Sequence, residues 1–305
     1  MRLVYRPLII MLIGSLTLPL AWAAQPQVPD TPGTGRFPAM KEETASLPSN
    51  VLYRPANIAA MGSTKLGVYV FGNGACVNDG ASSRLHLLEV ASHGYLAFAP
   101  GRILSGPGAK ATPPGQPAQS SVKSSYKDML AAIDWAVAQN ADPKSPYFLR
   151  IDTKAIAASG SSCGGAQAMR VAADPRVKTL VMMNSGLFGD DENTIIPEMD
   201  VRKSALKALH TPTLYVMGGE TDIAYNHAMD DFRRIEHVPV MMANLLGVGH
   251  GGSYWQPNGG KAATVVVAWL DWQLRGDAGA ARTFVGADCG LCRDKAWSVE
   301  KKRID

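Results

Sequence analysis

Features of several common protein classes are absent from this chain of 305 residues. It contains no HExxH pattern and no cysteine and histidine spacing typical of a metal site, so we expect no bound metal. Lysine and arginine cluster only at 301–303, which we interpret as a solvated end, and the net charge is only +4. This mild basicity does not predict a nucleic-acid partner. Internal repeats and evident linkers are also lacking, so we expect a single domain.

Long apolar segments and early cysteines are absent as well. An apolar stretch at 8–20 follows two arginines and precedes A-W-A, a pattern that predicts a signal peptide over 1–23. Gly14 and Pro19 interrupt the stretch, which is shorter than the roughly 20 residues of a membrane helix. No cysteine precedes Cys76, so no lipid anchor is expected near the cleavage point. We therefore expect a secreted or periplasmic protein with no membrane span after signal cleavage.

The four cysteines of an exported chain predict disulfides, for which three connectivities are possible. Cys289 and Cys292 form a C-x-x-C pattern in a tail rich in glycine and polar residues. A redox motif would lie at the start of a helix in a βαβ unit, so we favour a local structural bridge. Cys76 and Cys163 would then remain.

Strand-like and helix-like segments alternate along most of the chain. Residues 24–46 are rich in proline, glycine and threonine and predict a mobile mature N-terminus, followed by one domain at 47–305 that ends in the C-x-x-C tail. Short apolar runs predict strands at 51–54, 66–71, 95–99, 154–159, 177–183, 213–217 and 240–246. Helical spacing predicts helices at 84–92, 123–139, 165–173, 226–235 and 262–274. This order predicts an α/β fold with a doubly wound, mostly parallel sheet and helices on both faces. Residues 101–120 are expected to form a long loop, and 187–209 are a candidate cap.

The pentapeptide GSSCG at 160–164 matches G-x-S-x-G between an expected strand and an expected helix. A strand-to-helix turn of this kind crowds its central residue, so small residues must flank it. The turn would hold the hydroxyl of Ser162 at the end of the sheet, with the helix N-terminus behind it. Ser161 precedes the apex and is expected to be buried. Ser162 is therefore the candidate nucleophile.

A serine hydroxyl needs a base within hydrogen-bond reach and an acid that orients the base. In a doubly wound sheet such groups lie on loops at the carboxyl ends of strands. The strand expected at 213–217 leads into Asp222, and the strand at 240–246 leads into His250, which lies among glycines. We expect His250 to act as general base and then acid, and Asp222 to orient its imidazole. The order Ser162, Asp222, His250 is that of α/β hydrolases.

Other acidic and histidine residues are weaker candidates. Glu220 is the alternative acid, but Asp222 lies deeper in the turn and has the shorter side chain. The remaining histidines lie in or near expected helices, where a surface or helix-end position explains them. They are His86, His93, His210, His227 and His237.

Acyl transfer also needs hydrogen-bond donors for the developing oxyanion. The residue after the nucleophile, Cys163, would supply one backbone N–H, and Ala75, in the loop after the strand at 66–71, would supply the other. Cys76 and Cys163 would then each lie beside a donor, so a disulfide between them is our hypothesis. The alternative is two buried free thiols.

The matching segments together resemble the α/β-hydrolase superfamily, in its secreted branch near cutinases, polyester hydrolases and dienelactone hydrolase-like esterases. The resemblance covers about 50–275 and rests on segments at 53–55, 71–74, 160–165, 218–222 and 249–251. It implies hydrolysis of esters or related acyl bonds without a cofactor. The chain departs from these relatives in its oxyanion loop, GNGAC, where many have His-Gly, and in Cys163, where Met or Leu is usual. The tail after residue 277 has no counterpart among them.

These patterns predict an exported serine hydrolase that cleaves carboxylic esters through an acyl-enzyme intermediate. A small-molecule or polymeric ester is the expected substrate, and a monomer the expected state. Tyr254 and Trp255 are candidates for lining the substrate pocket, with ordinary packing as the alternative. Two other functions stay open: hydrolysis of amide or polyamide bonds in a polymer, and a binding role without catalysis.

Overall fold

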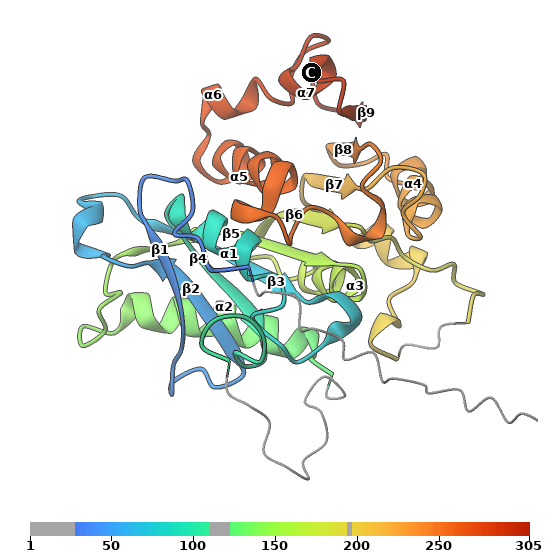
Figure 1. The fold of residues 1–305 in the computed structure, drawn as a ribbon. Coiled ribbons are helices and arrows are strands. Elements are labelled where there is room, and N and C mark those ends of the chain that lie inside the picture. The colour runs from blue at the N-terminus through green and yellow to red at the C-terminus, as the bar shows by residue number, and fades with distance from the viewer. Residues whose placement is uncertain (1–27, 110–122, 194–196) are drawn as a thin grey trace, which may run out of the picture.

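The computed structural model describes residues 28–109, 123–193 and 197–305, and these contain one sheet of nine strands (Figure 1). The strand order across the sheet is β1-β2-β4-β3-β5-β6-β7-β8-β9. The strands are β1 (Ala39–Glu43), β2 (Asn50–Pro55), β3 (Leu66–Gly72), β4 (Tyr95–Pro100), β5 (Ile151–Ser161), β6 (Val177–Met183), β7 (Thr213–Met217), β8 (Val240–Leu245) and β9 (Trp297–Lys302). The expected signal peptide, most of the loop at 101–120 and a small part of the candidate cap lie outside the described residues.

The strands from β4 across to β8 pair in parallel, whereas β1 with β2, β2 with β4, and β8 with β9 pair antiparallel. The predicted α/β class and mostly parallel sheet are therefore confirmed. Every strand and helix expected from the sequence is found, with ends that differ by a few residues. The expected helix at 123–139 begins instead at Tyr126, because Ser125 and Asp128 form a reciprocal capping box.

Helices pack against both faces of the sheet, which explains why its strands are apolar without strict alternation. The main helices are α1 (Arg84–Ser92), α2 (Tyr126–Ala141), α3 (Cys163–Val171), α4 (Tyr225–Arg234) and α5 (Gly260–Arg275). Alternate residues of β4 belong to two different cores: Leu96 and Phe98 lie in the core that also contains residues of α2, α3 and α4, and Tyr95 lies in the core that contains residues of α1 and α5. No described helix is both long enough and apolar enough to cross a bilayer.

Both antiparallel edges of the sheet differ from the sequence-based expectation. The prediction that residues 24–46 form a mobile N-terminus is wrong for Ala39–Glu43, which forms β1 and pairs with β2. Thr34, also within residues 24–46, donates its backbone N–H to the Glu89 carboxylate of α1 at 2.8 Å. The tail after residue 277 contains two short helices, α6 (Ala278–Ala281) and α7 (Gly290–Arg293), and ends in β9.

The last strand also completes a helix end. Lys302, in β9, donates from its Nζ to the carbonyl oxygens of Phe232, Arg233 and Ile235 at 2.9–3.1 Å. These carbonyls lie at the C-terminus of α4, where the last turn has no partners within the helix. A lysine placed there satisfies them and opposes the negative end of the helix dipole.

Candidate functional site

Ser162 lies at the turn between β5 and α3, at the carboxyl edge of the parallel strands. Its backbone has φ 52° and ψ −122°, a conformation that side-chain-bearing residues rarely adopt and that tends to persist at functional sites. The flanking glycines are required by space. A Cβ on Gly160 would lie 2.1 Å from the carbonyl oxygen of Gly164, and a Cβ on Gly164 would lie 2.1 Å from the backbone of Gly72. The turn is therefore as crowded as the pentapeptide predicts.

Ser162, His250 and Asp222 form one hydrogen-bonded chain. The Ser162 Oγ lies 3.0 Å from His250 Nε2, and His250 Nδ1 lies 2.6 Å from Asp222 Oδ1. The three residues follow β5, β8 and β7, which lie close together in the sheet. Because the Asp222 carboxylate can only accept, the His250 Nδ1 carries the proton and leaves Nε2 free to accept from the serine.

The Asp222 carboxylate is buried, and four donors converge on it. Oδ1 accepts from His250 and from the Ala224 N–H at 3.0 Å, and Oδ2 accepts from Asn184 Nδ2 at 2.6 Å and the Gly218 N–H at 3.2 Å. Burial by itself would raise the pKa of Asp222, but these hydrogen bonds outweigh it and hold the pKa below the ordinary value of 3.8. The carboxylate therefore stays ionised beside the imidazole.

Glu220 and the other histidines do not belong to the hydrogen-bonded chain of Ser162, His250 and Asp222. Glu220 is exposed, whereas Asp222 is 3% exposed. Within the described part of the chain, none of the contacts of the remaining histidines involves Ser162. His86 bonds the Tyr69 hydroxyl, His93 bonds Glu89, His237 bonds the Leu209 carbonyl, His227 lies 3.8 Å from Glu192, and His210 is exposed.

The two backbone donors expected for an oxyanion flank a disulfide. Cys76 and Cys163 lie at disulfide-bonding distance, with their Cα atoms 5.3 Å apart. Cys163 is the first residue of α3, so its N–H has no partner within the helix. Ala75 lies in the short turn η2 (Gly74–Cys76) with φ 51°, and its carbonyl accepts from Lys123 Nζ at 2.9 Å. The bridge thus ties the turn after β3 to the turn that carries Ser162.

The C-x-x-C cysteines form the second pair expected from the sequence. Cys289 and Cys292 lie at disulfide-bonding distance with a sequence separation of 3. The backbone N–H of Cys292 also donates to the Cys289 sulfur at 3.1 Å. Cys289 is buried and Cys292 is exposed at the start and end of a single helical turn, which fits a local structural bridge.

The two aromatic residues after His250 have different surroundings. Trp255 is 58% exposed, and its indole N–H donates to the carbonyl of Gly251, the residue after His250, at 3.0 Å. Tyr254 is 3% exposed, and its hydroxyl donates to Asn184 Oδ1. Its ring packs edge-on against His86. Tyr254 therefore lies behind the acid, and for this residue the expectation of a pocket-lining side chain is not met.

Asn184 is the site residue that the sequence analysis missed. It directly follows β6, is buried, and has φ 44°, a region that asparagine tolerates better than most residues. Its amide nitrogen reaches the Gly249 carbonyl at 3.1 Å as well as Asp222. No local pattern marks this residue, because its partners come from the loops after β7 and β8.

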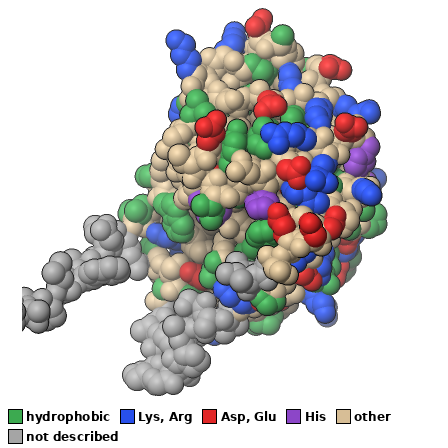
Figure 2. All heavy atoms as spheres, turned by 90° about the vertical axis from the view of Figure 1, so that its right-hand side faces the viewer, with side chains coloured by type: hydrophobic (Ala, Val, Ile, Leu, Met, Phe, Trp, Pro, Cys, Tyr) green, Lys and Arg blue, Asp and Glu red, His purple; other side chains and the backbone are tan. Residues whose placement is uncertain are grey.

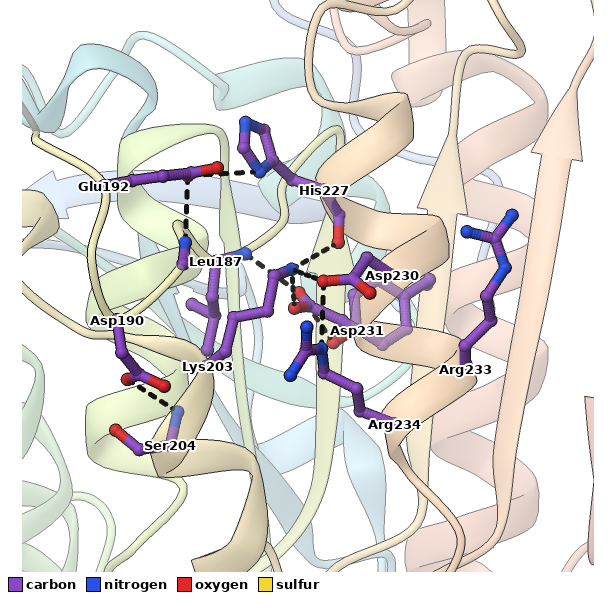
Figure 3. A network of polar contacts seen from close by, with 12 residues as sticks. Leu187, Asp190, Glu192, Lys203, Ser204, His227, Asp230, Asp231, Arg233 and Arg234 are labelled. Carbon is purple, nitrogen blue, oxygen red and sulfur yellow. Dashed lines mark hydrogen bonds and ion pairs between the residues drawn. The ribbon is translucent and has the colours of Figure 1, made fainter.

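The candidate cap at 187–209 is anchored to α4 by a buried ion pair (Figure 3). Lys203 lies at the start of the turn η5 (Lys203–Ala208), and its Nζ contacts Asp231 at 2.7 Å and Asp230 at 3.1 Å. Asp231 also accepts from the Leu187 N–H at 2.9 Å. Burial raises the pKa of Asp231 to about 6, although the Lys203 ammonium opposes this shift. The Asp231 carboxylate thus holds both the first residue of the segment, Leu187, and Lys203 in its second half.

Basic and acidic side chains are mixed on one face of the molecule, and the described residues contain no cluster of potential metal ligands. On the face shown in Figure 2, lysine and arginine side chains are interspersed with aspartate and glutamate. Within 28–109, 123–193 and 197–305, no group of three or more histidine, cysteine, aspartate or glutamate residues is placed to hold a metal ion. No family model matches the chain, and a search of curated proteins finds no matching relative.

Proposed function

We propose that the protein is an exported serine hydrolase that cleaves carboxylic ester bonds through an acyl-enzyme intermediate, on the α/β-hydrolase fold. The observation that carries the proposal is the continuous chain from Ser162 Oγ through His250 to a buried Asp222, with distances of 3.0 and 2.6 Å. A serine held at φ 52° between a strand and a helix, with a base and an orienting acid in reach, is the arrangement that acyl transfer requires.

In the acylation step, Ser162 Oγ attacks the carbonyl carbon of the ester while its proton passes to His250 Nε2. The carbonyl oxygen gains negative charge and accepts hydrogen bonds from the Ala75 and Cys163 N–H groups. The tetrahedral intermediate then breaks its bond to the alcohol oxygen, which takes the proton from Nε2. The products of this step are the free alcohol and an ester on Ser162.

Deacylation repeats these steps with water as the nucleophile. His250 Nε2 takes a proton from the water, whose oxygen attacks the acyl carbon, and returns the proton to Ser162 Oγ as the acyl bond breaks. The imidazolium formed in each step lies 2.6 Å from the Asp222 carboxylate. Because that carboxylate is ionised and held by four donors, it stabilises the imidazolium without taking its proton.

Export and the substrate class belong to the same proposal. Two disulfides are what an oxidising compartment outside the cytosol permits, and they support a secreted or periplasmic location. The expected monomeric state is part of the same proposal. The exposed indole of Trp255, next to His250, offers an apolar surface for the acyl or alcohol part of a small-molecule or polymeric ester.

Labelling with a fluorophosphonate tests the proposal directly. The probe should attach to Ser162 in the native protein, and peptide mass spectrometry locates the label. The Ser162→Ala variant should be neither labelled nor active. Turnover of matched ester and amide substrates, from short acyl chains to polymers, then defines the bond cleaved. An intact protein that stays unlabelled at Ser162 and hydrolyses no ester would refute the proposal.

A further inference from the structure

Asn184 and Tyr254 have contacts that the proposed reaction does not yet use. We propose that these two residues, named here the clamp, are positioning residues that hold the acid and the histidine loop in register for proton transfer. The inference rests on the proposed function and assigns a role to side chains that touch neither the substrate nor the reacting atoms.

The clamp joins the ends of three neighbouring strands. Asn184 follows β6, and its backbone N–H donates to the Val216 carbonyl of β7 at 2.8 Å. Its side-chain nitrogen donates to Asp222 Oδ2 at 2.6 Å and to the Gly249 carbonyl at 3.1 Å. One amide group therefore holds the acid and the backbone next to His250 at the same time.

The acceptors around the amide fix its orientation. The ionised Asp222 carboxylate and the Gly249 carbonyl can only accept hydrogen bonds, so the amide nitrogen must face them. Asn184 Oδ1 then faces Tyr254, whose hydroxyl donates to it. Tyr254 lies four residues after His250 and is buried, so the histidine loop itself supplies the group that prevents the amide from flipping. Among the described residues, every polar atom of the Asn184 amide is engaged in this way.

The geometry implies that the clamp acts on chemistry rather than on substrate binding. Asp222 must present Oδ1 to His250 in both the ground state and the imidazolium state. Without the clamp, the carboxylate loses one of its four donors and can rotate away from the imidazole. Removing the clamp should therefore lower kcat and leave KM nearly unchanged, the pattern of an interaction that matters in the transition state.

Tyr254→Phe is the first test, because it removes only the hydroxyl and keeps the ring packing against His86. We expect kcat to fall about tenfold, with KM within about twofold of the original protein. Tyr69→Phe is the matched control. Tyr69 is another buried tyrosine, whose hydroxyl bonds His86 at 2.9 Å and does not contact the clamp. Both variants should lose similar stability, but only Tyr254→Phe should lose kcat.

Substitutions at Asn184 give a pH readout that a structural role would not produce. Asn184→Gly keeps the left-handed backbone and removes the amide, so its kcat relative to the original protein should be low and independent of pH. Asn184→Asp places a second carboxyl against Asp222, and when protonated it can donate the same hydrogen bond. Its relative kcat should therefore fall at least about tenfold between about pH 6 and pH 9, as the shared proton is lost. The titratable groups near the amide are Asp222, His250 and Tyr254, with His86 and Tyr69 beyond the Tyr254 ring.

Activity and proton NMR together separate the two proposals. The downfield resonance of the His250 Nδ1 proton reports the bond to Asp222 without turnover, and it should broaden or shift in Asn184→Gly and Tyr254→Phe but not in Tyr69→Phe. An original protein that is neither labelled nor active refutes the proposed function, while the resonance still tests the clamp. Folded clamp variants with unchanged kcat, or with an unchanged resonance, would overturn the clamp.

Discussion

Removing the Cys76–Cys163 disulfide should lower both the stability and the activity of the protein. We consider the double variant Cys76→Ala/Cys163→Ala, because each cysteine is fully buried and a single substitution would leave a free thiol. The bridge closes a loop with a sequence separation of 87. For 87 residues the chain-entropy relation gives about 4.6 kcal/mol, toward the upper end of measured disulfide contributions.

The second disulfide provides the matched control. Cys289→Ala/Cys292→Ala removes a bridge with a sequence separation of 3, for which the same relation gives about 1.6 kcal/mol. Urea unfolding, followed by fluorescence and by circular dichroism, measures both losses from the shift of the midpoint and the slope. The first variant should lose about 3 kcal/mol more than the second. Equal losses would show that loop closure is not the main contribution of the Cys76–Cys163 bridge.

The same pair of variants separates stability from catalysis. Without the bridge, the turn that holds the Ala75 N–H is no longer tied to the turn that holds the Cys163 N–H. Losing one oxyanion donor typically costs about 100- to 1,000-fold in kcat, so partial loss should cost at least about tenfold. The Cys289→Ala/Cys292→Ala variant should keep its kcat, since that bridge lies in the tail. The measurement is ester turnover without urea, at a temperature where both variants are folded. An unchanged kcat in the Cys76→Ala/Cys163→Ala variant would refute the argument.

Three further perturbations test other parts of the structure. Burial lowers the pKa of His86 to about 4, so protonation favours the unfolded chain, and the stability from this residue is present above about pH 6.5 and lost as the pH falls toward 4. Between about pH 7 and pH 4, the original protein should therefore lose about 3 kcal/mol more unfolding free energy than the His86→Phe variant. Urea unfolding at each pH measures this difference, and equal losses in the two proteins would contradict it. Lys203→Met leaves the buried Asp231 without its ion pair and should cost about 3–5 kcal/mol in thermal or urea unfolding, with partial recovery in Lys203→Met/Asp231→Leu. Gly164→Ala would press a methyl group onto the backbone of β3 and should lower the free energy of unfolding by at least about 3 kcal/mol. Gly251→Ala, whose methyl group would meet nothing within 4 Å, should lower it little. Similar losses in the two variants would disprove the packing argument.

The interior of the sheet was predictable because its strands are covered on both faces. β6 and β7, for example, are short and mostly apolar, as is typical of parallel strands that are buried on both faces. The order of Ser162, Asp222 and His250 along the chain was predictable for a related reason. Each follows such a strand, and the carboxyl ends of parallel strands meet at one edge.

The edge strands were not predictable in the same way. β1 has the sequence AMKEE and β9 has WSVEKK, and most of their side chains are half-buried or exposed. Strands that pair on one side and face solvent need no apolar run, and charged side chains there discourage pairing with other chains. Their place in the sheet depends on backbone pairing with β2 and β8, which composition does not encode.

The clamp was missed because its geometry exists only after the sheet has formed. Asn184 and Tyr254 lie 70 positions apart in the sequence, and neither belongs to a recognisable motif. Of the two alternatives for Tyr254, ordinary packing agrees with the structure: the chain after His250 turns the Tyr254 ring inward, toward His86, while Trp255 is exposed. Sequence proximity to a functional residue therefore predicts participation in the site better than it predicts contact with a substrate.

The ionised state of Asp222 connects the fold with the proposed chemistry. Burial alone would favour a protonated carboxyl, which could not stabilise an imidazolium. The four donors that reverse this preference come from the acid's own loop, from Asn184 after β6 and from His250 after β8. They can converge because β6, β7 and β8 are consecutive in the sheet. The sheet order that brings Ser162, Asp222 and His250 together thus also supplies the hydrogen bonds that keep the acid charged. A change in the register of β6 would therefore weaken the candidate site without altering any of these three residues.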